Sequence, residues 1–309
     1  MRRIIIYALF SLVILSVSNR SYARELNGFS LDNTLVPSQE IFLGGPPKDA
    51  IPSIDRPEFI LAKDAKFLNP TDRVLGISIG SEVKAYPIRI LNWHEIINDN
   101  IADQNIVVTY CPLCGTGMVF EMPSSIQSFG VSGLLYNSDM LLYDRQTDSL
   151  WSQIKAQAIS GSMKGQRLKQ LMASHTTWQD WKSRYPKTLV LSTETGFVRD
   201  YTRSPYGGYE QSEQLFFSVP NEDKRYHPKE QVLGVEVNGI FKAYPFSELS
   251  RSRTPMTDNI AGQSINIFFS SEHKTGRVYI DKNHEIPTTI GFWFAWTAFH
   301  PDTEVYVAP

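Results

Sequence analysis

Short apolar runs separated by turn residues dominate the hydrophobic pattern of this chain. Residues 74–87 contain a strand-like run, a two-residue Gly-Ser turn and a second strand-like run, and residues 232–245 repeat this frame around an Asn-Gly turn. Asn-Gly is a strong signal for a type I′ hairpin, and Gly-Ser suits a type II′ turn. The pattern predicts a mainly β chain with minor α-helix, which is an α+β protein.

The similarity between these two segments continues further along the chain. Residues 99–104 and 258–263 share the sequence Asp-Asn-Ile-Ala-x-Gln, after a shift of one residue relative to the first match. Chance is a poor explanation for two matching blocks in the same order. We therefore predict an internally duplicated β-rich unit, with a first repeat at 58–120 and a second at 230–309.

A middle segment at 121–229 separates the two predicted repeats. We expect a β-meander and one helix in it, because strand-like runs alternate with turn residues at 134–136, 140–143 and 149–151. Thr177 and Asp180 have the spacing of a helix N-cap, and Pro186 ends that helix. Residues 24–57 are rich in proline and are expected to form an extended N-terminal arm.

Residues 1–23 have the pattern of a secretory signal peptide. Two arginines precede an apolar run at 4–17, and small residues lead to Ala23. The run is shorter than the roughly 20 residues that a transmembrane helix needs. We predict an exported protein of the periplasm or cell envelope, cleaved after Ala23 and without a stable membrane span afterwards. An uncleaved anchor is the alternative.

The charge balance changes the expectation for binding partners. The chain has 30 Lys and Arg against 32 Asp and Glu, so it lacks the basic character of nucleic-acid-binding proteins. Hydrophobic residues make up 42% of the chain and charged residues 20%, which is typical of a globular protein and not of a disordered one. The partner is expected to be a protein or a small molecule.

Candidate chemistry begins with the two cysteines, which share the motif Tyr-Cys-Pro-Leu-Cys-Gly-Thr at 110–116. A β-branched strand precedes the motif, and a glycine-containing turn leads from it into another strand. A thioredoxin-type redox site instead lies at a helix N-terminus, where the helix dipole lowers the thiol pKa. The strand-turn-strand setting resembles the metal-binding knuckle of rubredoxins and zinc ribbons. Cys111 and Cys114 are therefore predicted metal ligands, and a redox-active dithiol and an inert local disulfide or packing role are the alternatives.

The second repeat differs from the first at this motif. Ser270 stands opposite Cys111, and His273 stands opposite Cys114. The surrounding Thr-Gly pair is present in both repeats, so the turn is expected to form without thiols.

His94 is the best candidate for a third ligand or a catalytic group. It shares an inward helical stripe with Ile90 and Ile97, and a short connection separates it from the cysteine strand. A core histidine bonded to a backbone carbonyl is the alternative interpretation. A Cys2His set with one open position suits zinc, iron or copper(I).

Three polar residues of the middle segment form a second candidate group. Asp139, Asp144 and Arg145 could form a polar catalytic cluster beside the cysteines. Solvated turn residues are the alternative interpretation.

Several motifs carry a family resemblance: 92–99, 110–116, 129–139, 143–145, 150–153 and 191–196. On these residues, the chain resembles the uncharacterised bacterial domain-of-unknown-function family 3179. The resemblance implies an exported or envelope protein and supplies no activity.

These observations lead to one functional hypothesis and two alternatives. The hypothesis is an exported metal-dependent protein, with oxidoreductase as the candidate reaction class and the cysteines at its site. The alternatives are a thiol–disulfide redox protein and a non-catalytic binding module of the envelope. The sequence leaves open whether the protein is an enzyme.

Overall fold

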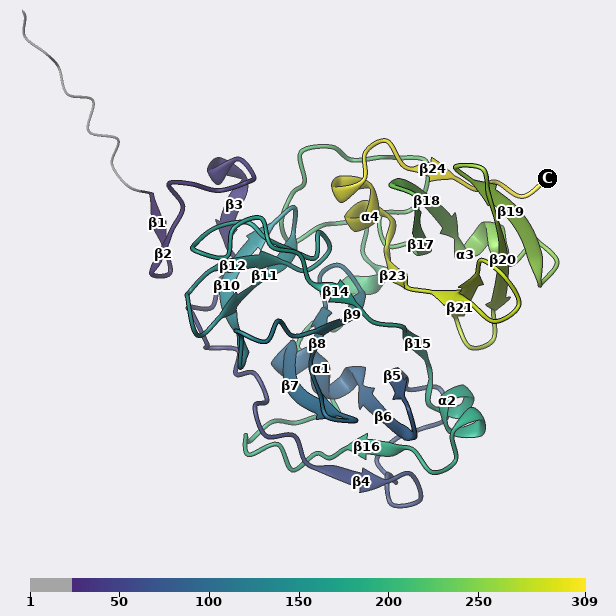
Figure 1. Cartoon of the computed structure of the whole chain (residues 1–309), viewed down its shortest axis with the longest axis horizontal. Coiled ribbons are helices and arrows are strands. Elements are labelled where there is room, and N and C mark those ends of the chain that lie inside the picture. Colours follow the sequence, from purple (N-terminus) through teal and green to yellow (C-terminus); the bar gives the residue numbers. More distant parts are fainter. Residues whose placement is uncertain (1–23) are drawn as a thin grey trace, which may run out of the picture.

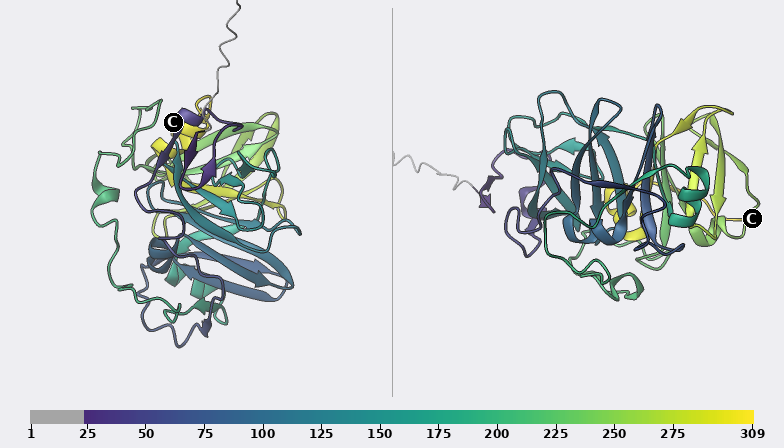
Figure 2. Two further views of the ribbon diagram at one scale, coloured as in Figure 1. Left: turned by 90° about the vertical axis from the view of Figure 1, so that its left-hand side faces the viewer. Right: turned by 90° about the horizontal axis from the view of Figure 1, so that it is seen from below.

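The computed structural model describes residues 24–309, and the predicted signal peptide lies outside the described residues. The chain is mainly β, as predicted, with short helices between strands. Its small sheets have a propeller-like arrangement (Figures 1 and 2). None of the helices in the described residues is long and apolar enough to cross a membrane.

Two sheets carry the elements of the first repeat, and we call them the first unit. One has the strand order β15 (Ala173–Thr177), β5 (Arg73–Ile79), β6 (Glu82–Pro87), β16 (Leu189–Leu191), β4 (Phe59–Leu61). The other has the order β14 (Lys169–Gln170), β9 (Thr116–Glu121), β8 (Gln104–Cys111), β7 (Ile96–Ile101). Helix α1 (Ile88–His94) follows β6, and α2 (Trp178–Arg184) follows β15.

The second unit has the same order of elements, apart from β4, which has no counterpart. One of its sheets runs β23 (Thr288–Phe292), β17 (Gln231–Val237), β18 (Ile240–Pro245), β24 (Glu304–Val305). The other runs β19 (Met256–Ile260), β20 (Gln263–Ser270), β21 (Thr275–Tyr279), β22 (Glu285–Ile286). Helix α3 (Phe246–Leu249) follows β18, and α4 (Trp293–Phe299) follows β23. Strands β14 to β16 and α2 fall in the predicted middle segment by sequence, yet they belong to the sheets of the first unit.

Side chains correspond between the units as well. The hairpins β5–β6 and β17–β18 have the same register, with Gly76 opposite Ala85 and Gly234 opposite Ala243. A partly buried lysine–aspartate pair recurs as Lys84–Asp99 at 2.9 Å and Lys242–Asp258 at 2.7 Å. These matches are what a duplication would produce, and the duplication itself stays a prediction.

A third part of the molecule, the inserted sheet, lies between β9 and β14 in the sequence. Its strand order is β13 (Gln157–Ala158), β12 (Leu150–Ser152), β11 (Asp139–Asp144), β10 (Phe129–Tyr136), β3 (Ile41–Leu43). Strand β3 belongs to the N-terminal arm, which also forms the hairpin β1 (Glu25–Leu26) and β2 (Phe29–Ser30) and the 3-10 turn η1 (Ser38–Glu40). The N-terminal arm is therefore attached to the inserted sheet, in which β3 is an edge strand paired with β10.

The largest hydrophobic core joins all three parts. It contains both cysteines, Trp151 of the inserted sheet, and Phe292 and Phe299 of the second unit. A long connection at 192–230, whose one regular element is the 3-10 turn η2 (Tyr209–Gln211), crosses from the first unit to the second (Figure 2). It packs Tyr209 and other apolar side chains on this core. The cysteine motif is thus covered on every side by buried residues.

A tight glycine contact tests the packing of the first unit. A Cβ added to Gly76 would overlap the indole of Trp181, which is fixed by its hydrogen bond to Thr188 (3.0 Å). We expect Gly76→Ala to lower the free energy of unfolding by about 1–3 kcal/mol, measured by chemical denaturation.

The matched control is Gly207→Ala. The nearest neighbour of an added Cβ there is a carbonyl oxygen at 3.6 Å, so we expect a change below about 1 kcal/mol. An equal loss of stability in both variants would contradict the packing argument.

Candidate metal site at Cys111 and Cys114

The cysteine motif forms a tight turn between β8 and β9. Cys111 is the last residue of β8, and the amide of Cys114 donates to its carbonyl at 3.2 Å. Gly115 follows with φ of 62°, a conformation that favours glycine. A Cβ at this position would also lie 2.9 Å from the ring of Phe292. The Cys-Pro-Leu-Cys-Gly sequence therefore fits both the turn and its neighbour.

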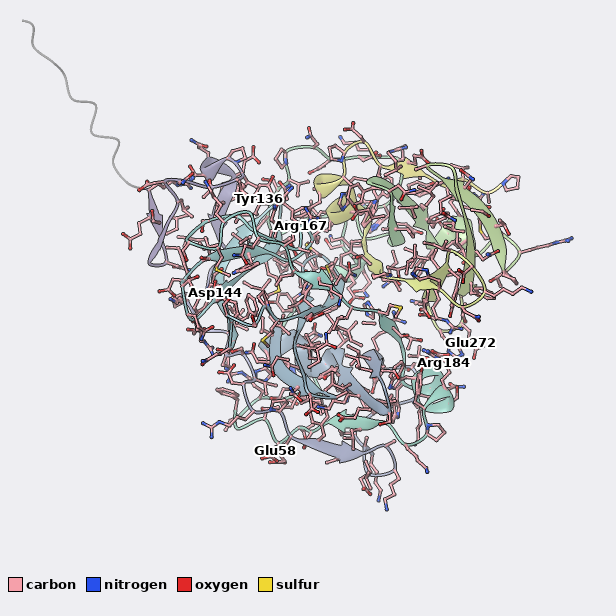
Figure 3. All side chains as sticks on the ribbon, viewed as in Figure 1. Glu58, Tyr136, Asp144, Arg167, Arg184 and Glu272 are labelled. Atoms are coloured by element: carbon pink, nitrogen blue, oxygen red, sulfur yellow. The ribbon has the colours of Figure 1, made fainter. Side chains whose placement is uncertain are left out.

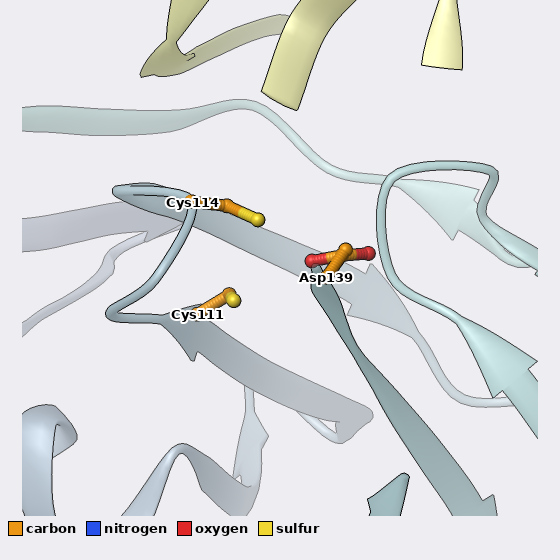
Figure 4. Close-up of side chains that lie close together, drawn as sticks. All are labelled: Cys111, Cys114 and Asp139. Atoms are coloured by element: carbon orange, nitrogen blue, oxygen red, sulfur yellow. The ribbon is translucent and has the colours of Figure 1, made fainter. Parts of the chain in front are cut away.

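Asp139 is brought to this turn by the hairpin β10–β11. Asn137 and Ser138 have φ of 50° and 64°, the two positive values that a type I′ turn requires. Asp139 is the first residue of β11 and follows that turn directly. Its side chain points toward the two sulfurs (Figure 4).

Three donor atoms gather at this point. One ligand atom each from Cys111, Cys114 and Asp139 lie within 4.8 Å of one another. All three residues are buried, with exposed fractions of 1%, 0% and 0%. Within residues 24–309 this is the one group of three such donor residues close enough to hold a metal ion. Both cysteines are free thiols in the structure.

Few hydrogen bonds stabilise these groups. Oδ2 of Asp139 accepts from the amide of Ile154 at 3.1 Å. Sγ of Cys114 lies 3.4 Å from the carbonyl oxygen of Ser138. Asp139 has no ion pair with any described cation. Three groups that can each become an anion are thus buried together without a compensating positive side chain.

Burial decides the protonation of the cluster. Desolvation raises the pKa of both thiols, and Cys111 and Asp139 add to the rise at Cys114. Desolvation also raises the pKa of Asp139 to about 7, although the hydrogen bond from the Ile154 amide lowers this pKa in part. Catalytic cysteines of disulfide oxidoreductases have a lowered pKa, because the thiolate is the nucleophile. The electrostatics here are the opposite of those in a thioredoxin-type site.

Unpaired polar atoms are concentrated around the cluster. The described residues contain six buried side-chain atoms without a hydrogen-bond partner, and four of them belong to Asn137 (Oδ1), Ser138 (Oγ), Asp139 (Oδ1) and Tyr209 (Oη). Tyr209 belongs to the same core cluster as both cysteines, and a negative charge on either sulfur would raise the pKa of its hydroxyl. A buried polar atom left unpaired costs about 1–3 kcal/mol. The arrangement therefore fits an ion or small ligand that would satisfy these atoms.

His94 is not part of this group, contrary to the Cys2His expectation. Its Nδ1 lies 2.7 Å from the carbonyl oxygen of Pro52, and its Nε2 lies 2.6 Å from the hydroxyl of Tyr201. Both ring nitrogens are therefore already hydrogen-bonded away from the sulfurs. His94 points inward as predicted, but α1 ends at this residue and Ile97 lies on β7, so the predicted helical stripe through Ile97 is wrong and the ring enters the core of the first unit. Asp139 occupies the third position of the donor set.

Asp144 and Arg145 are also separate from the cysteines. Asp144 ends β11, and five residues of strand place it roughly 17 Å from Asp139. It accepts a hydrogen bond from the indole of Trp151 at 2.9 Å. Arg145 pairs with Asp55 at 2.5 Å, an ion pair that holds the N-terminal arm. The expected polar cluster thus divides into one site residue and two structural residues.

The second unit forms the corresponding turn without thiols. Ser270 pairs with Thr275, and the amide of His273 donates to the Ser270 hydroxyl at 3.2 Å. The ring of His273 lies against Thr177, and its carbonyl accepts from Arg73 of the first unit at 2.6 Å. The thiols are therefore not needed to make this turn.

Glu95 is a site neighbour that the sequence analysis did not identify. It follows α1 with φ of 58°, it is buried, and its Oε1 accepts from the hydroxyl of Tyr206 at 3.1 Å. Burial raises its pKa from 4.5 to about 7, and its charge in turn raises the pKa of Cys111. Its position beside His94 was the available signal, but Tyr206 is 111 residues distant in sequence.

This raised pKa predicts a pH dependence of stability. The folded chain keeps the Glu95 proton between about pH 4.5 and 7, whereas the unfolded chain releases it, so stability falls as pH rises through this window. Glu95→Gln removes this loss while keeping an acceptor for Tyr206. As the pH rises from about 5 to about 8, we expect the free energy of unfolding of the variant to increase relative to that of the wild type by up to roughly 3 kcal/mol.

Urea denaturation at several pH values, with a chelator present, measures this difference. The matched control is Glu58→Gln, because Glu58 is an exposed glutamate away from the site (Figure 3). Parallel pH profiles of the wild type and Glu95→Gln would contradict the prediction.

Comparison with known proteins identifies the family but no activity. The family model described as "Protein of unknown function (DUF3179)" matches residues 48–290. Neither the curated proteins nor the solved structures gave a match. The matched range includes the Cys-x-x-Cys turn, Asp139 and Glu95, and it confirms the resemblance carried by the sequence motifs. Because the match spans most of the 309 residues, the chain belongs to the DUF3179 family.

Proposed function

We propose that Cys111, Cys114 and Asp139 bind a transition metal ion and that the chain works as an exported metal protein. The observation that carries this proposal is the buried group of three donor atoms within 4.8 Å of one another. The unpaired Oδ1 of Asp139 supports it, since a carboxylate oxygen without a partner is available to an ion. The raised pKa values of the three groups agree with it, because a cation would compensate their buried charge.

Zinc fits this donor set best. Cysteine sulfur and aspartate oxygen are both established zinc ligands, whereas copper(I) prefers soft sulfur donors alone. Three protein ligands leave one position open in a four-coordinate ion, which is the arrangement of catalytic zinc sites. The unpaired Tyr209 hydroxyl belongs to the same core cluster as the cysteines and would be available to hydrogen-bond to a further ligand of a bound ion.

The oxidoreductase hypothesis depends on which metal is bound. Zinc carries no redox chemistry and acts as a Lewis acid. Iron or copper in the same donors would be needed for a redox reaction. The proposal is therefore a zinc site first, with oxidoreductase activity tied to a redox-active occupant.

Location in the periplasm or envelope is part of the proposal. It rests on the signal-like pattern at 1–23. An oxidising compartment favours disulfide formation between neighbouring thiols. A bound ion would protect Cys111 and Cys114 from this oxidation, which gives the metal a second role.

Metal analysis of the full chain, exported to the periplasm and purified without chelator, tests the proposal. We expect about one zinc per wild-type chain and almost none in Cys111→Ser/Cys114→Ser. Asp139→Asn should lower the affinity for zinc by at least about tenfold, since it removes an anionic ligand. Ser270 already occupies the position equivalent to Cys111, so serine is compatible with the fold of this turn.

Asp200→Asn is the control for Asp139→Asn, because Asp200 is exposed on the connection at 192–230. Equal metal content in the wild type and the double serine variant would refute the site. A metal-free wild type with a reversible disulfide above roughly −300 mV would instead favour the thiol–disulfide alternative. A double serine variant that keeps biological activity would favour the binding module.

A further inference from the structure

A cavity of about 280 Å³ lies between the inserted sheet and the second unit. Strands β17 and β23 and helix α4 supply one side, and the segment at 154–157 with Arg167 supplies the other. Figure 3 shows Arg167 where these two parts of the molecule meet. The volume is at the small end of the range of about 300–1,000 Å³ for ligand pockets. A cavity of this size between two parts of a chain is a common place for a small ligand.

Two cations of this cavity have no acidic partner. Neither Lys155 nor Arg167 forms an ion pair in the part of the chain that the structure describes. Glu236 is the one acidic residue among the lining residues. The lining therefore has a formal charge of +1, which a ligand with a single negative charge would neutralise.

The opposite wall of the cavity is aromatic. The ring of His300 stacks on the ring of Phe241, with centroids 3.8 Å apart. The ring centroid of Trp296 lies 4.3 Å from that of His300. The indole of Trp296 is fixed by its hydrogen bond to Thr303 at 2.9 Å. Burial and the charge of Lys155 lower the pKa of His300 to about 4, so its ring is neutral near pH 7. A neutral imidazole offers one N–H donor and an apolar face.

The first unit lacks this combination. The indole of Trp181, which corresponds to Trp296, packs on Tyr185 at 4.4 Å much as Trp296 packs on His300 at 4.3 Å, but the guanidinium of Arg184 also covers it at 5.0 Å. In the second unit, Phe299 and His300 take the places of Arg184 and Tyr185, and the cations come from the inserted sheet. A charged wall and an aromatic wall therefore face each other beside Trp296 in the second unit and not beside Trp181 in the first.

We propose that this cavity binds a small organic monocarboxylate with a flat apolar body. The carboxylate would pair with Lys155 and Arg167, since guanidinium and carboxylate form charge-assisted hydrogen bonds. The apolar body would pack against Phe241, Trp296 and His300. Glu236 on β17 disfavours ligands with several negative charges, because like charges in one cavity repel each other.

The inner end of the cavity adjoins the cysteine cluster. Ile154 lines the cavity, and its backbone amide donates to Oδ2 of Asp139. Met118 also lines it and belongs to the same core cluster as both cysteines. The cavity therefore adjoins the candidate metal site, although none of the contacts invoked for carboxylate binding involves a metal.

Isothermal titration of the full mature chain with benzoate tests the proposal, with benzamide as the uncharged probe of the same shape. We expect saturable benzoate binding that Lys155→Gln/Arg167→Gln weakens by at least about tenfold, because two charge-assisted hydrogen bonds are lost. Lys169→Gln is the matched control, since Lys169 pairs with Glu121 outside the cavity. Circular dichroism melting verifies that each variant is folded.

Three outcomes would overturn the proposal. They are no saturable benzoate binding below about 10 mM, equal binding of benzamide, and unchanged benzoate binding by the folded double variant. The Cys111→Ser/Cys114→Ser variant is expected to bind benzoate like the wild type. That expectation separates a failure of this proposal from a failure of the metal site.

Discussion

The contact between the cysteine turn and the second unit determines where the sulfurs lie. The amide of Phe292 donates to the carbonyl oxygen of Cys114 at 2.8 Å, and the ring of Phe292 lies against Gly115. A Cβ on Gly291 would come within 2.5 Å of Thr116, so glycine is needed on both sides of this contact. The turn is consequently fixed between β8 and β9 by its own hydrogen bonds and by β23 from the other unit. A site built on such a contact has a defined geometry before any ligand arrives.

The chemistry of the site follows from burial more than from the identity of its residues. Two thiols and one carboxyl group are exposed to no solvent and have no cationic neighbour, so each holds its proton more tightly than it would in water. A divalent ion held by Cys111, Cys114 and Asp139 would replace these protons, and the same burial would strengthen its attraction to the three anionic groups. The unpaired oxygens of Asp139 and Tyr209 agree with this interpretation, because native proteins rarely leave buried polar atoms unsatisfied.

The sequence predicted the local features well and the long-range placement poorly. The hairpins around Gly-Ser and Asn-Gly, the strand-turn-strand setting of the cysteines and the candidacy of Asp139 all come from patterns within about ten residues. His94 shows the limit of such patterns: its stripe indicates an inward direction, but Pro52 and Tyr201, which occupy its ring nitrogens, are distant in sequence. Asp144 and Arg145 are close to Asp139 in sequence, yet an extended strand separates them from the site. Tyr209 and Tyr206, the hydrogen-bond partner of Glu95, reach the site from the long connection at 192–230, where hydrophobic periodicity carries no information.

The two units have the same framework, and the inserted sheet accounts for what distinguishes the first. Matching hairpins, lysine–aspartate pairs and indole–glycine contacts occur in both units, so these features support the fold and no specific chemistry. Asp139 comes from the insert, as do Ile154, which orients its carboxylate, and Lys155, which enters the neighbouring cavity. The cysteine turn of the first unit faces this insert, whereas the turn of the second unit, with Ser270 and His273, faces Thr177 and Arg73. The donors and the cavity are thus found together because one inserted sheet contacts both units, whereas the corresponding turn of the second unit faces no such insert and forms without thiols.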